Sequence, residues 1–239
     1  MTASWREFWN RDNPIYANDR HRTLHYAGLA REIAALVPHA DAQVLDYGCG
    51  EALSADRVAR ACGRLILCDA APRVREALAR RFAAEPRIAV MAPEELEGLA
   101  EASLDLIVAN SVAQYLTRAE LEASLRLWRR MLRPGGSLIL ADVIPPDLGP
   151  VADARALLAF AGSGGFLGAA LLGLARTALS DYRALRQRLG LSQYAQADML
   201  ALLRAAGFTA ERRPRNLGHN QGRMAFTARV QPPEAARPA

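Results

Sequence analysis

Short apolar runs alternate with amphipathic segments from residue 42 to residue 142. The apolar runs predict strands at Gln43–Asp46, Arg64–Cys68, Ile88–Met91, Leu104–Ala109 and Ser137–Ala141. The segments between them have helical spacing and predict helices near 53–61, 72–83, 94–101 and 118–132. Strands that are apolar throughout and alternate with helices are typical of a parallel sheet covered on both faces. The pattern therefore predicts an α/β fold.

The two ends of the chain follow other patterns. Residues 1–40 predict an N-terminal helical cap, with a helix that is capped by Asp19 or Thr23 and stopped by Pro38. Near the other end, a regular helical pattern is followed by two alternating segments of the kind that form an antiparallel hairpin. These elements are expected at Ser192–Ala206, Phe208–Arg213 and Arg223–Val230, and the Pro/Ala-rich tail 231–239 is expected to be disordered.

Residues 147–195 interrupt the alternation of strands and helices. Residues 156–175 carry no charge and are long enough on paper to span a bilayer. However, Gly162-Ser163-Gly164-Gly165 falls in the middle, so we expect two apolar helices joined by a glycine turn, with a third beginning at Ser180. A helical lid over the active site is the favoured interpretation. A lid that also touches a membrane surface and a spanning helix are the alternatives.

Composition removes several classes of function. The formal net charge of +5 comes entirely from arginine, because the 239 residues include no lysine. The arginines are scattered among acids, so a nucleic-acid partner is not expected. Without lysine there is no P-loop lysine and no pyridoxal Schiff base. The three cysteines form no CxxC pair and the N-terminus has no secretory signal, so we expect a single cytoplasmic domain without disulfides or zinc.

One turn points to a nucleoside cofactor. The first predicted strand ends in Asp46, which is followed by glycines at alternate positions, Gly48 and Gly50. About 20 residues later the second strand ends in Asp69, the spacing at which a carboxylate meets ribose hydroxyls. A dinucleotide site would have a third glycine where this chain has Leu53. An NAD-type oxidoreductase is therefore the weaker alternative.

Several stretches together resemble the class I S-adenosylmethionine-dependent methyltransferases, in particular small-molecule enzymes similar to methyltransferase types 11 and 25. Residues 44–52 are similar to motif I of that family, D-x-G-x-G-x-G, with Ala52 in place of the last glycine. Further matches are the acid that ends the second strand, the fourth strand, the turn before the fifth strand and the terminal hairpin. The first three of these occupy Leu67-Cys68-Asp69, residues 103–111 and residues 130–136.

The resemblance implies a Rossmann-like sheet of seven strands with helices on both faces, a terminal antiparallel hairpin and a lid inserted between strands five and six. It also implies S-adenosylmethionine as cofactor. Many members carry an acid after strand three that meets the adenine, whereas this chain has Ala92-Pro93 there, so Glu94 or a backbone carbonyl is expected to serve. The implied cofactor-binding residues are Asp46, Gly48, Cys49, Gly50, Asp69, Ala70, Pro93, Glu94, Asn110 and Ser111.

The methyl acceptor is left open by the sequence. Methyl transfer from a sulfonium mainly requires alignment and exclusion of water, and an oxygen nucleophile would also need a general base. The candidates for that base are Asp142, His25 and His219, and the candidate walls of the substrate pocket are Tyr26, Gln114 and Tyr115. His21 and His25 lie one helical turn apart, but no metal site is expected because no third ligand lies nearby.

The apolar lid favours a small, apolar acceptor, and a quinone, a lipid, a polyketide and a small acid all remain open. A monomer or a homodimer is expected, with peripheral membrane contact as an alternative. A third hypothesis is a non-catalytic protein that binds a nucleoside cofactor and acts at a partner or membrane surface.

Overall fold

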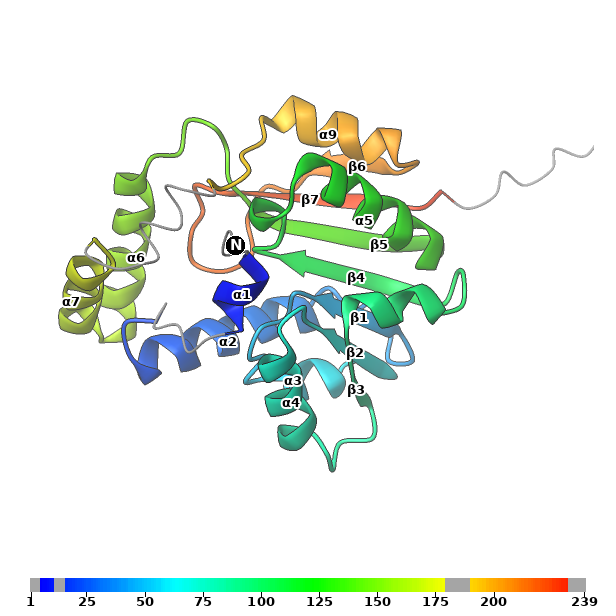
Figure 1. Ribbon diagram of the computed structural model, residues 1–239, viewed down its shortest axis with the longest axis horizontal. Helices are drawn as coiled ribbons and strands as arrows, with labels where there is room; N and C mark the ends of the chain where they lie inside the picture. The colour runs from blue at the N-terminus through cyan, green and yellow to red at the C-terminus, as the bar shows by residue number, and fades with distance from the viewer. Residues whose placement is uncertain (1–4, 11–15, 179–189, 232–239) are drawn as a thin grey trace, which may run out of the picture.

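A seven-stranded sheet organises the protein in the computed structural model, which describes residues 5–10, 16–178 and 190–231 (Figure 1). The strand order is β3-β2-β1-β4-β5-β7-β6. β1 to β5 run parallel, whereas β7 is antiparallel to both β5 and β6. The strands in chain order are β1 (Gln43–Tyr47), β2 (Arg64–Cys68), β3 (Ile88–Met91), β4 (Leu104–Asn110), β5 (Leu132–Val143), β6 (Thr209–Arg212) and β7 (Met224–Arg229). The expected fold class and its terminal antiparallel hairpin are confirmed.

The strand order reverses between β1 and β4, at the centre of the sheet. Ligands of open α/β sheets bind beyond the carboxyl ends of the strands at such a switch point. The antiparallel β7 between β5 and β6 also separates this sheet from the dinucleotide-binding fold, whose strand order is 3-2-1-4-5-6. The topology therefore disfavours the oxidoreductase alternative and marks the end of β1 as the place to look for a site.

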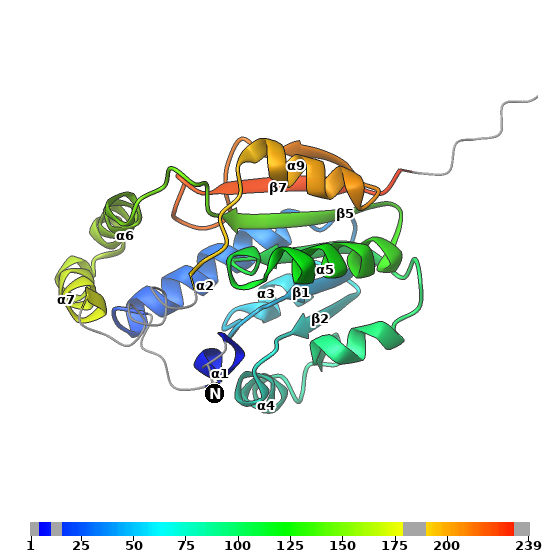
Figure 2. The same ribbon diagram turned by 45° about the horizontal axis from the view of Figure 1, so that its top comes forward.

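Helices cover both faces of the sheet (Figures 1 and 2). Successive residues of a strand point to opposite faces, so Val44 packs in one layer and Leu45 in the other. The layer that contains Val44 is formed by helices α2 (Asp19–Ala34), α3 (Ala55–Ala59) and α4 (Pro72–Arg81). These helices contribute Ile33, Val58 and Leu78 to it. The second layer comes from the 3-10 helix η1 (Pro93–Gly98), α5 (Arg118–Met131) and α9 (Gln196–Ala205).

An inserted helical hairpin follows β5. It consists of α6 (Pro150–Gly164) and α7 (Leu167–Ala178), joined at Gly165, which ends α6 in the left-handed conformation with φ of +71°. Its small core of Ala161, Phe166 and Ala170 packs against Leu24 of α2. The third helix expected from Ser180 lies outside the described residues, as does the tail from residue 232.

None of the helices in the described part of the chain combines the length and the apolar character needed to cross a bilayer.

Several predicted boundaries were wrong. Asn18, not Asp19 or Thr23, caps α2: its side-chain oxygen accepts a hydrogen bond from the backbone of His21 at 2.8 Å. The helix then ends at Ala34, well before Pro38. The helix expected at 94–101 is the 3-10 helix η1, and the one expected at 53–61 covers only Ala55–Ala59.

Two further differences come from backbone hydrogen bonds that local patterns do not reveal. The helix expected from Ser192 begins at Gln196, because the backbone N–H groups of Ser192 and Tyr194 donate to Gln114 and Ile144 instead. Strand β5 begins at Leu132, before the Pro-Gly-Gly turn. That turn is held to the end of β7 by hydrogen bonds between Gly135, Gly136 and Val230.

Candidate active site

The turn after β1 has no room for side chains at its two glycines. Gly48 has a φ of +72°, and a Cβ there would lie 2.4 Å from a methyl carbon of Val112. Gly50 has a φ of +56°, and its Cβ would lie 2.7 Å from the hydroxyl oxygen of Tyr26. The backbone N–H of Gly48 donates to the carbonyl oxygen of Cys68 at 2.7 Å, which ties the turn to the end of β2. The turn therefore presents bare backbone at the switch point.

Asp69 links this turn to strand β2. One carboxylate oxygen accepts a hydrogen bond from the backbone of Gly50 at 3.0 Å, and the other accepts one from Ala71 at 2.8 Å. Burial raises the pKa of Asp69, and these two hydrogen bonds oppose the shift. Because an ionised carboxylate has about four acceptor sites, each oxygen keeps capacity for a ligand hydroxyl. Asp69 can therefore hold the turn and bind a sugar at once.

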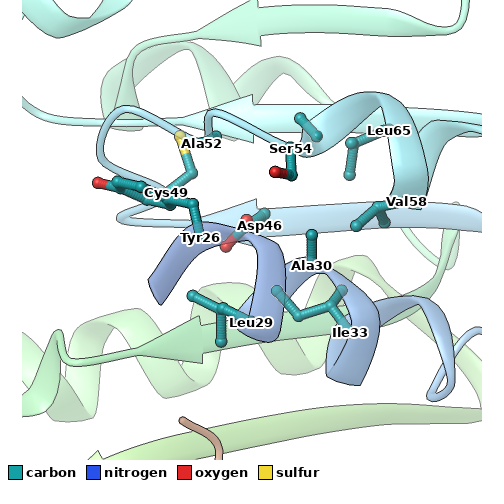
Figure 3. A pocket seen from close by; sticks show the side chains of 11 residues that line it. Tyr26, Leu29, Ala30, Ile33, Asp46, Cys49, Ala52, Ser54, Val58 and Leu65 are labelled. Carbon is teal, nitrogen blue, oxygen red and sulfur yellow. The ribbon is translucent and has the colours of Figure 1, made fainter. Parts of the chain in front are cut away.

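Asp46 lies on the other side of the turn, in a small cavity between β1 and helices α2 and α3 (Figure 3). Its exposed fraction is 9%, and within the described part of the chain no hydrogen bond reaches its carboxylate. Burial, and secondarily the nearby Asp69, raises the pKa of Asp46 to about 7. The cavity of about 20 Å³ is large enough for one water molecule. Asp46 is thus a buried carboxyl group whose hydrogen-bonding capacity is left for water or a ligand.

Of the four described residues other than glycine with left-handed backbone, three lie near the same edge of the sheet, and the fourth, Ala102, precedes β4. Ala52, Ser111 and Asp142 have φ values of +39°, +59° and +61°, although none is glycine. They follow or end strands β1, β4 and β5. Left-handed backbone at a residue with a side chain costs about 1–3 kcal/mol and is concentrated at functional sites. Ala52 occupies the position of the last glycine in the family motif that residues 44–52 resemble, and its backbone is in the left-handed conformation that glycine adopts readily.

The predicted base Asp142 is held in an ion pair. One of its carboxylate oxygens accepts hydrogen bonds from the Ser111 hydroxyl at 2.6 Å and the Arg223 guanidinium at 2.7 Å. The other oxygen accepts one from the Asn216 amide at 3.3 Å. Both oxygens are therefore engaged, and this geometry fits a structural role better than proton abstraction.

Arg223 extends the same network to the helical hairpin. Its guanidinium also contacts Asp153 of α6 at 3.1 Å and the side-chain oxygen of Gln114 at 3.2 Å. Burial lowers the pKa of Arg223, but the carboxylates of Asp142 and Asp153 outweigh this and hold it above the ordinary value. Arg223 is therefore a permanently charged bridge between the end of the sheet and α6.

The other two predicted bases lie together in an aromatic cluster. The ring centroids of His25 and His219 are 6.4 Å apart, and His219 stacks on Phe160 of α6 at 4.8 Å. Burial, with the neighbouring His219 and His21, lowers the pKa of His25 to about 4. Burial also lowers the pKa of His219. Both rings are consequently neutral at physiological pH.

His21 completes the cluster. It stacks on Phe166 at 4.9 Å, its Nδ1 accepts a hydrogen bond from the backbone of Ala17, and burial lowers its pKa to about 4. Tyr16 packs against it at 5.3 Å. Among the residues that the structure describes, no group of three or more His, Cys, Asp or Glu side chains is arranged to hold a metal ion.

The three predicted pocket residues occupy different places. Tyr26 lies against the glycine turn, where its hydroxyl oxygen accepts a hydrogen bond from the backbone of Glu51 at 2.9 Å. Gln114 is buried against Arg223. Tyr115 packs against Trp5 and Trp9 of the short helix α1 (Trp5–Trp9), with ring centroids at 4.8 and 5.5 Å. Helix α1 thus covers the adjoining 3-10 turn η2 (Ala113–Tyr115) at this end of the sheet.

The remaining predicted cofactor residues divide between this edge of the sheet and a groove between η1 and α5. Cys49 is a buried free thiol whose pKa burial raises, and Ala70 directly follows Asp69. Asn110 donates to the Ser111 hydroxyl, and its own buried side-chain oxygen has no partner in the described part of the chain. Pro93 and Glu94 line a groove of about 580 Å³ together with Tyr47 and Arg130.

Several residues of this site were missed by the sequence analysis: Tyr16, Phe160, Phe166, Asn216 and Arg223. Arg223 lies 81 residues from Asp142, and Asn216 lies 74 residues from it. Contacts at such separation leave no periodic signal. The richness of the β6–β7 loop in polar residues was the one signal in the sequence that could have pointed to Asn216 and Arg223.

Comparisons with known proteins agree with this geometry. Residues 45–140 match a family described as "Methyltransferase domain". An uncharacterized methyltransferase of Mycobacterium tuberculosis is 29% identical over 137 residues, which cover 57% of this chain and 64% of that protein. The chain therefore spans less than two thirds of that relative.

Two solved structures share the fold. One is a complex between the Haloferax volcanii Trm112 methyltransferase activator and the putative methyltransferase, with a TM-score of 0.61 and 15% identity over 97% of this chain and 100% of the other. The second is Haemonchus contortus phosphoethanolamine N-methyltransferase 1, with a TM-score of 0.60 and 16% identity over 97% of this chain and 49% of the other. The strand order, the glycine turn and the match of residues 45–140 to a methyltransferase domain together make this chain similar to the class I S-adenosylmethionine-dependent methyltransferases.

Proposed function

We propose that this protein transfers a methyl group from S-adenosylmethionine to a small molecule. The observation that carries the proposal is the glycine turn between two acids, Asp46 and Asp69, at the switch point of the sheet. The residues present suit the cofactor, because the turn would be filled by any Cβ at Gly48 or Gly50. Asp46 and the unpartnered oxygen of Asn110 supply buried acceptors for its polar groups.

Each part of the cofactor has a matching group on the protein. Asp69 would accept hydrogen bonds from the ribose hydroxyls, and the Gly48–Gly50 backbone would approach the methionine portion. Asp46 and Asn110 would face its amino and carboxyl end, where the positive charge of the ammonium group favours an ionised Asp46. Pro93 and Glu94 would lie on the adenine side. When bound, the cofactor supplies an activated methyl group on a sulfonium.

The chain aligns the acceptor and excludes water from the reaction. The acceptor would lie at the carboxyl ends of β4 and β5, below the cap formed by α1 and α2 and the lid formed by α6 and α7. The residues of this edge would hold the methyl donor in line with the acceptor, and the products would be S-adenosylhomocysteine and the methylated acceptor. Any proton released from the acceptor would pass to water, because burial lowers the pKa values of the neighbouring histidines.

The state of the candidate bases supports one chemical class of acceptor over another. Asp142 is occupied by Arg223, and His25 has a pKa of about 4. A base this weak cannot assist an aliphatic alcohol efficiently, because catalytic efficiency is best when the pKa of the base lies near the working pH. We therefore propose an acceptor that ionises readily, such as a phenol, an enol or an acid, or an amine that arrives unprotonated.

We also propose that the chain forms a single domain and acts in the cytoplasm. The three cysteines Cys49, Cys62 and Cys68 are free and buried, which is compatible with a reducing compartment.

Transfer of a labelled methyl group tests this function. The protein is incubated with methyl-labelled S-adenosylmethionine and a cell extract, and the label is then followed into small-molecule, protein and nucleic-acid fractions. We expect label in the small-molecule fraction, and less of it for Asp69→Ala at limiting donor. Label confined to protein or nucleic acid would contradict the small-molecule acceptor, and no label in any fraction would contradict methyl transfer to any acceptor in the extract.

A further inference from the structure

The hairpin of α6 and α7 exposes an unusual amount of apolar side chain. Val151, Leu167, Leu171 and Leu172 are exposed by 72%, 47%, 54% and 52%, and these four are the large exposed hydrophobic residues of the described chain. All of them lie on this one insertion. Isolated exposed leucines need no explanation, but their concentration on one element indicates an interaction surface.

The other exposed side chains of the hairpin are mostly small, and few of them are charged. Ala152, Ala159, Gly168 and Ala175 are also exposed. Protein interfaces are enriched in aromatic side chains and arginine, and their energetic centres are seldom leucine or valine. An aliphatic face with few hydrogen-bonding groups instead matches a fluid hydrocarbon phase.

Within the described part of α6 and α7, the exposed charged side chain is basic. Between residues 150 and 178 the sequence has one acid, Asp153, and it points inward to Arg223 and Asn220. Arg155 is exposed on α6. Arg20, exposed at the start of α2, donates to the carbonyl oxygen of Gly164 and so lies at the α6–α7 turn. Helices with an apolar face and flanking basic residues bind in the plane of anionic lipid surfaces.

The position of the hairpin connects this face to the candidate active site. Figures 1 and 2 both place α6 and α7 at the outer edge of the molecule, beside the start of α2. The inner side of the hairpin contributes Phe160, which stacks on His219, and Phe166, which stacks on His21. One element therefore has an aliphatic outer face and an aromatic inner face toward the acceptor side.

From these observations we infer that the outer face of α6 and α7 docks on an anionic lipid bilayer, from which the enzyme takes a membrane-partitioned acceptor. The inference rests on the proposed function for the acceptor, whereas the docking itself does not. Helices of 15 and 12 residues reach about 1.5 Å per residue, so they lie on the surface of a bilayer rather than crossing it.

Vesicle flotation of the full chain tests the docking. We expect binding to phosphatidylcholine vesicles that contain phosphatidylglycerol, and weaker binding to phosphatidylcholine alone. The double variant Leu171→Gln, Leu172→Gln should bind on the order of tenfold more weakly, because two half-exposed leucines lose their burial in lipid. The matched control Leu171→Met, Leu172→Met keeps apolar area at both positions and should bind as the wild type does. Arg155→Gln should weaken binding to the anionic vesicles by about fivefold.

Two other measurements keep the outcomes distinct. Thermal unfolding and S-adenosylmethionine affinity should be the same for the Gln and Met variants. If wild type binds the cofactor but not the vesicles, the lipid inference is wrong and the proposed function stands. If wild type binds vesicles but not the cofactor, the proposed function is wrong and the docking on lipid stands. A wild-type dimer in light scattering that the Gln variant converts to monomer would assign the face to a second copy of the chain and overturn the lipid inference.

Discussion

At the scale of single residues, the site is built from groups held in costly states. Asp46 is a buried carboxyl group without a protein hydrogen bond in the described chain, and Ala52, Ser111 and Asp142 occupy left-handed backbone. Such costs are tolerated where surrounding packing enforces them and a ligand uses them. Each can therefore be tested by a substitution that removes or increases the cost.

Gly50→Ala should destabilise the free protein by about 1–3 kcal/mol, because alanine is strained in left-handed backbone. Its Cβ would also meet the Tyr26 hydroxyl at 2.7 Å. Urea unfolding without cofactor measures the effect. Gly98→Ala is the control, since nothing lies within 4 Å of its Cβ and its φ is not left-handed. Equal stabilities of the two variants would refute a conformational requirement for glycine at position 50.

The stability of the free protein should depend on pH through Asp46. Its pKa is raised from 3.8 to about 7, so the unfolded chain loses the proton at lower pH than the folded chain does. The contribution of Asp46 to the free energy of unfolding therefore decreases as pH rises across that window. Asp46→Asn, which does not titrate, should match the wild type near about pH 4 and exceed its stability by roughly 2–4 kcal/mol near about pH 8. Denaturant unfolding at both pH values checks this, and a constant difference between the two proteins would contradict it.

At the scale of elements, the helical insertion is tied to the sheet by a charged bridge. Arg223 next to β7 holds Asp142 of β5 at 2.7 Å and Asp153 of α6 at 3.1 Å. The three side chains are exposed by only 14%, 14% and 20%. Removing one member of such a buried group leaves the others as uncompensated charges.

Arg223→Met should therefore destabilise the protein by about 2–4 kcal/mol, while the aliphatic length of the side chain is kept. Arg229→Met is the matched control, because its ion pair with Glu211 is 4.0 Å long and both side chains are more than 60% exposed. An exposed pair of this kind contributes about 0–1 kcal/mol. Thermal or urea unfolding of both variants gives the comparison, and similar losses would rule out the bridge as a special element.

The predicted elements were most accurate in two short apolar strands of the parallel sheet. The limits of β2 and β3 were predicted to the residue, since each is an apolar run in a parallel sheet. The start of α9 was wrong because residues 192–195 bond to distant backbone at Gln114 and Ile144. The cap of α2 was wrong because Asn18 and Asp19 are both good capping residues, and local sequence does not choose between adjacent candidates.

At the scale of the whole molecule, the proposed cofactor side and the proposed acceptor side differ in how far local sequence predicts them. The cofactor side follows from short motifs such as 46–50 and the acid at 69, because each motif lies within one strand and its turn. The acceptor side is assembled from α1, α2, α6 and the β6–β7 loop, whose members His25 and His219 are 194 positions apart in the numbering. Such an assembly depends on tertiary packing, which is why its aromatic and arginine members were not predicted.

Calorimetric titration of the full chain with S-adenosylmethionine and, separately, with NAD tests the central claim most directly. The account predicts binding of S-adenosylmethionine at one site and no heat with NAD. It also predicts that Asp69→Ala weakens binding of the methyl donor by about 1–3 kcal/mol, the cost of lost hydrogen bonds to a charged group. No heat with S-adenosylmethionine, or an affinity that Asp69→Ala leaves unchanged, would contradict it.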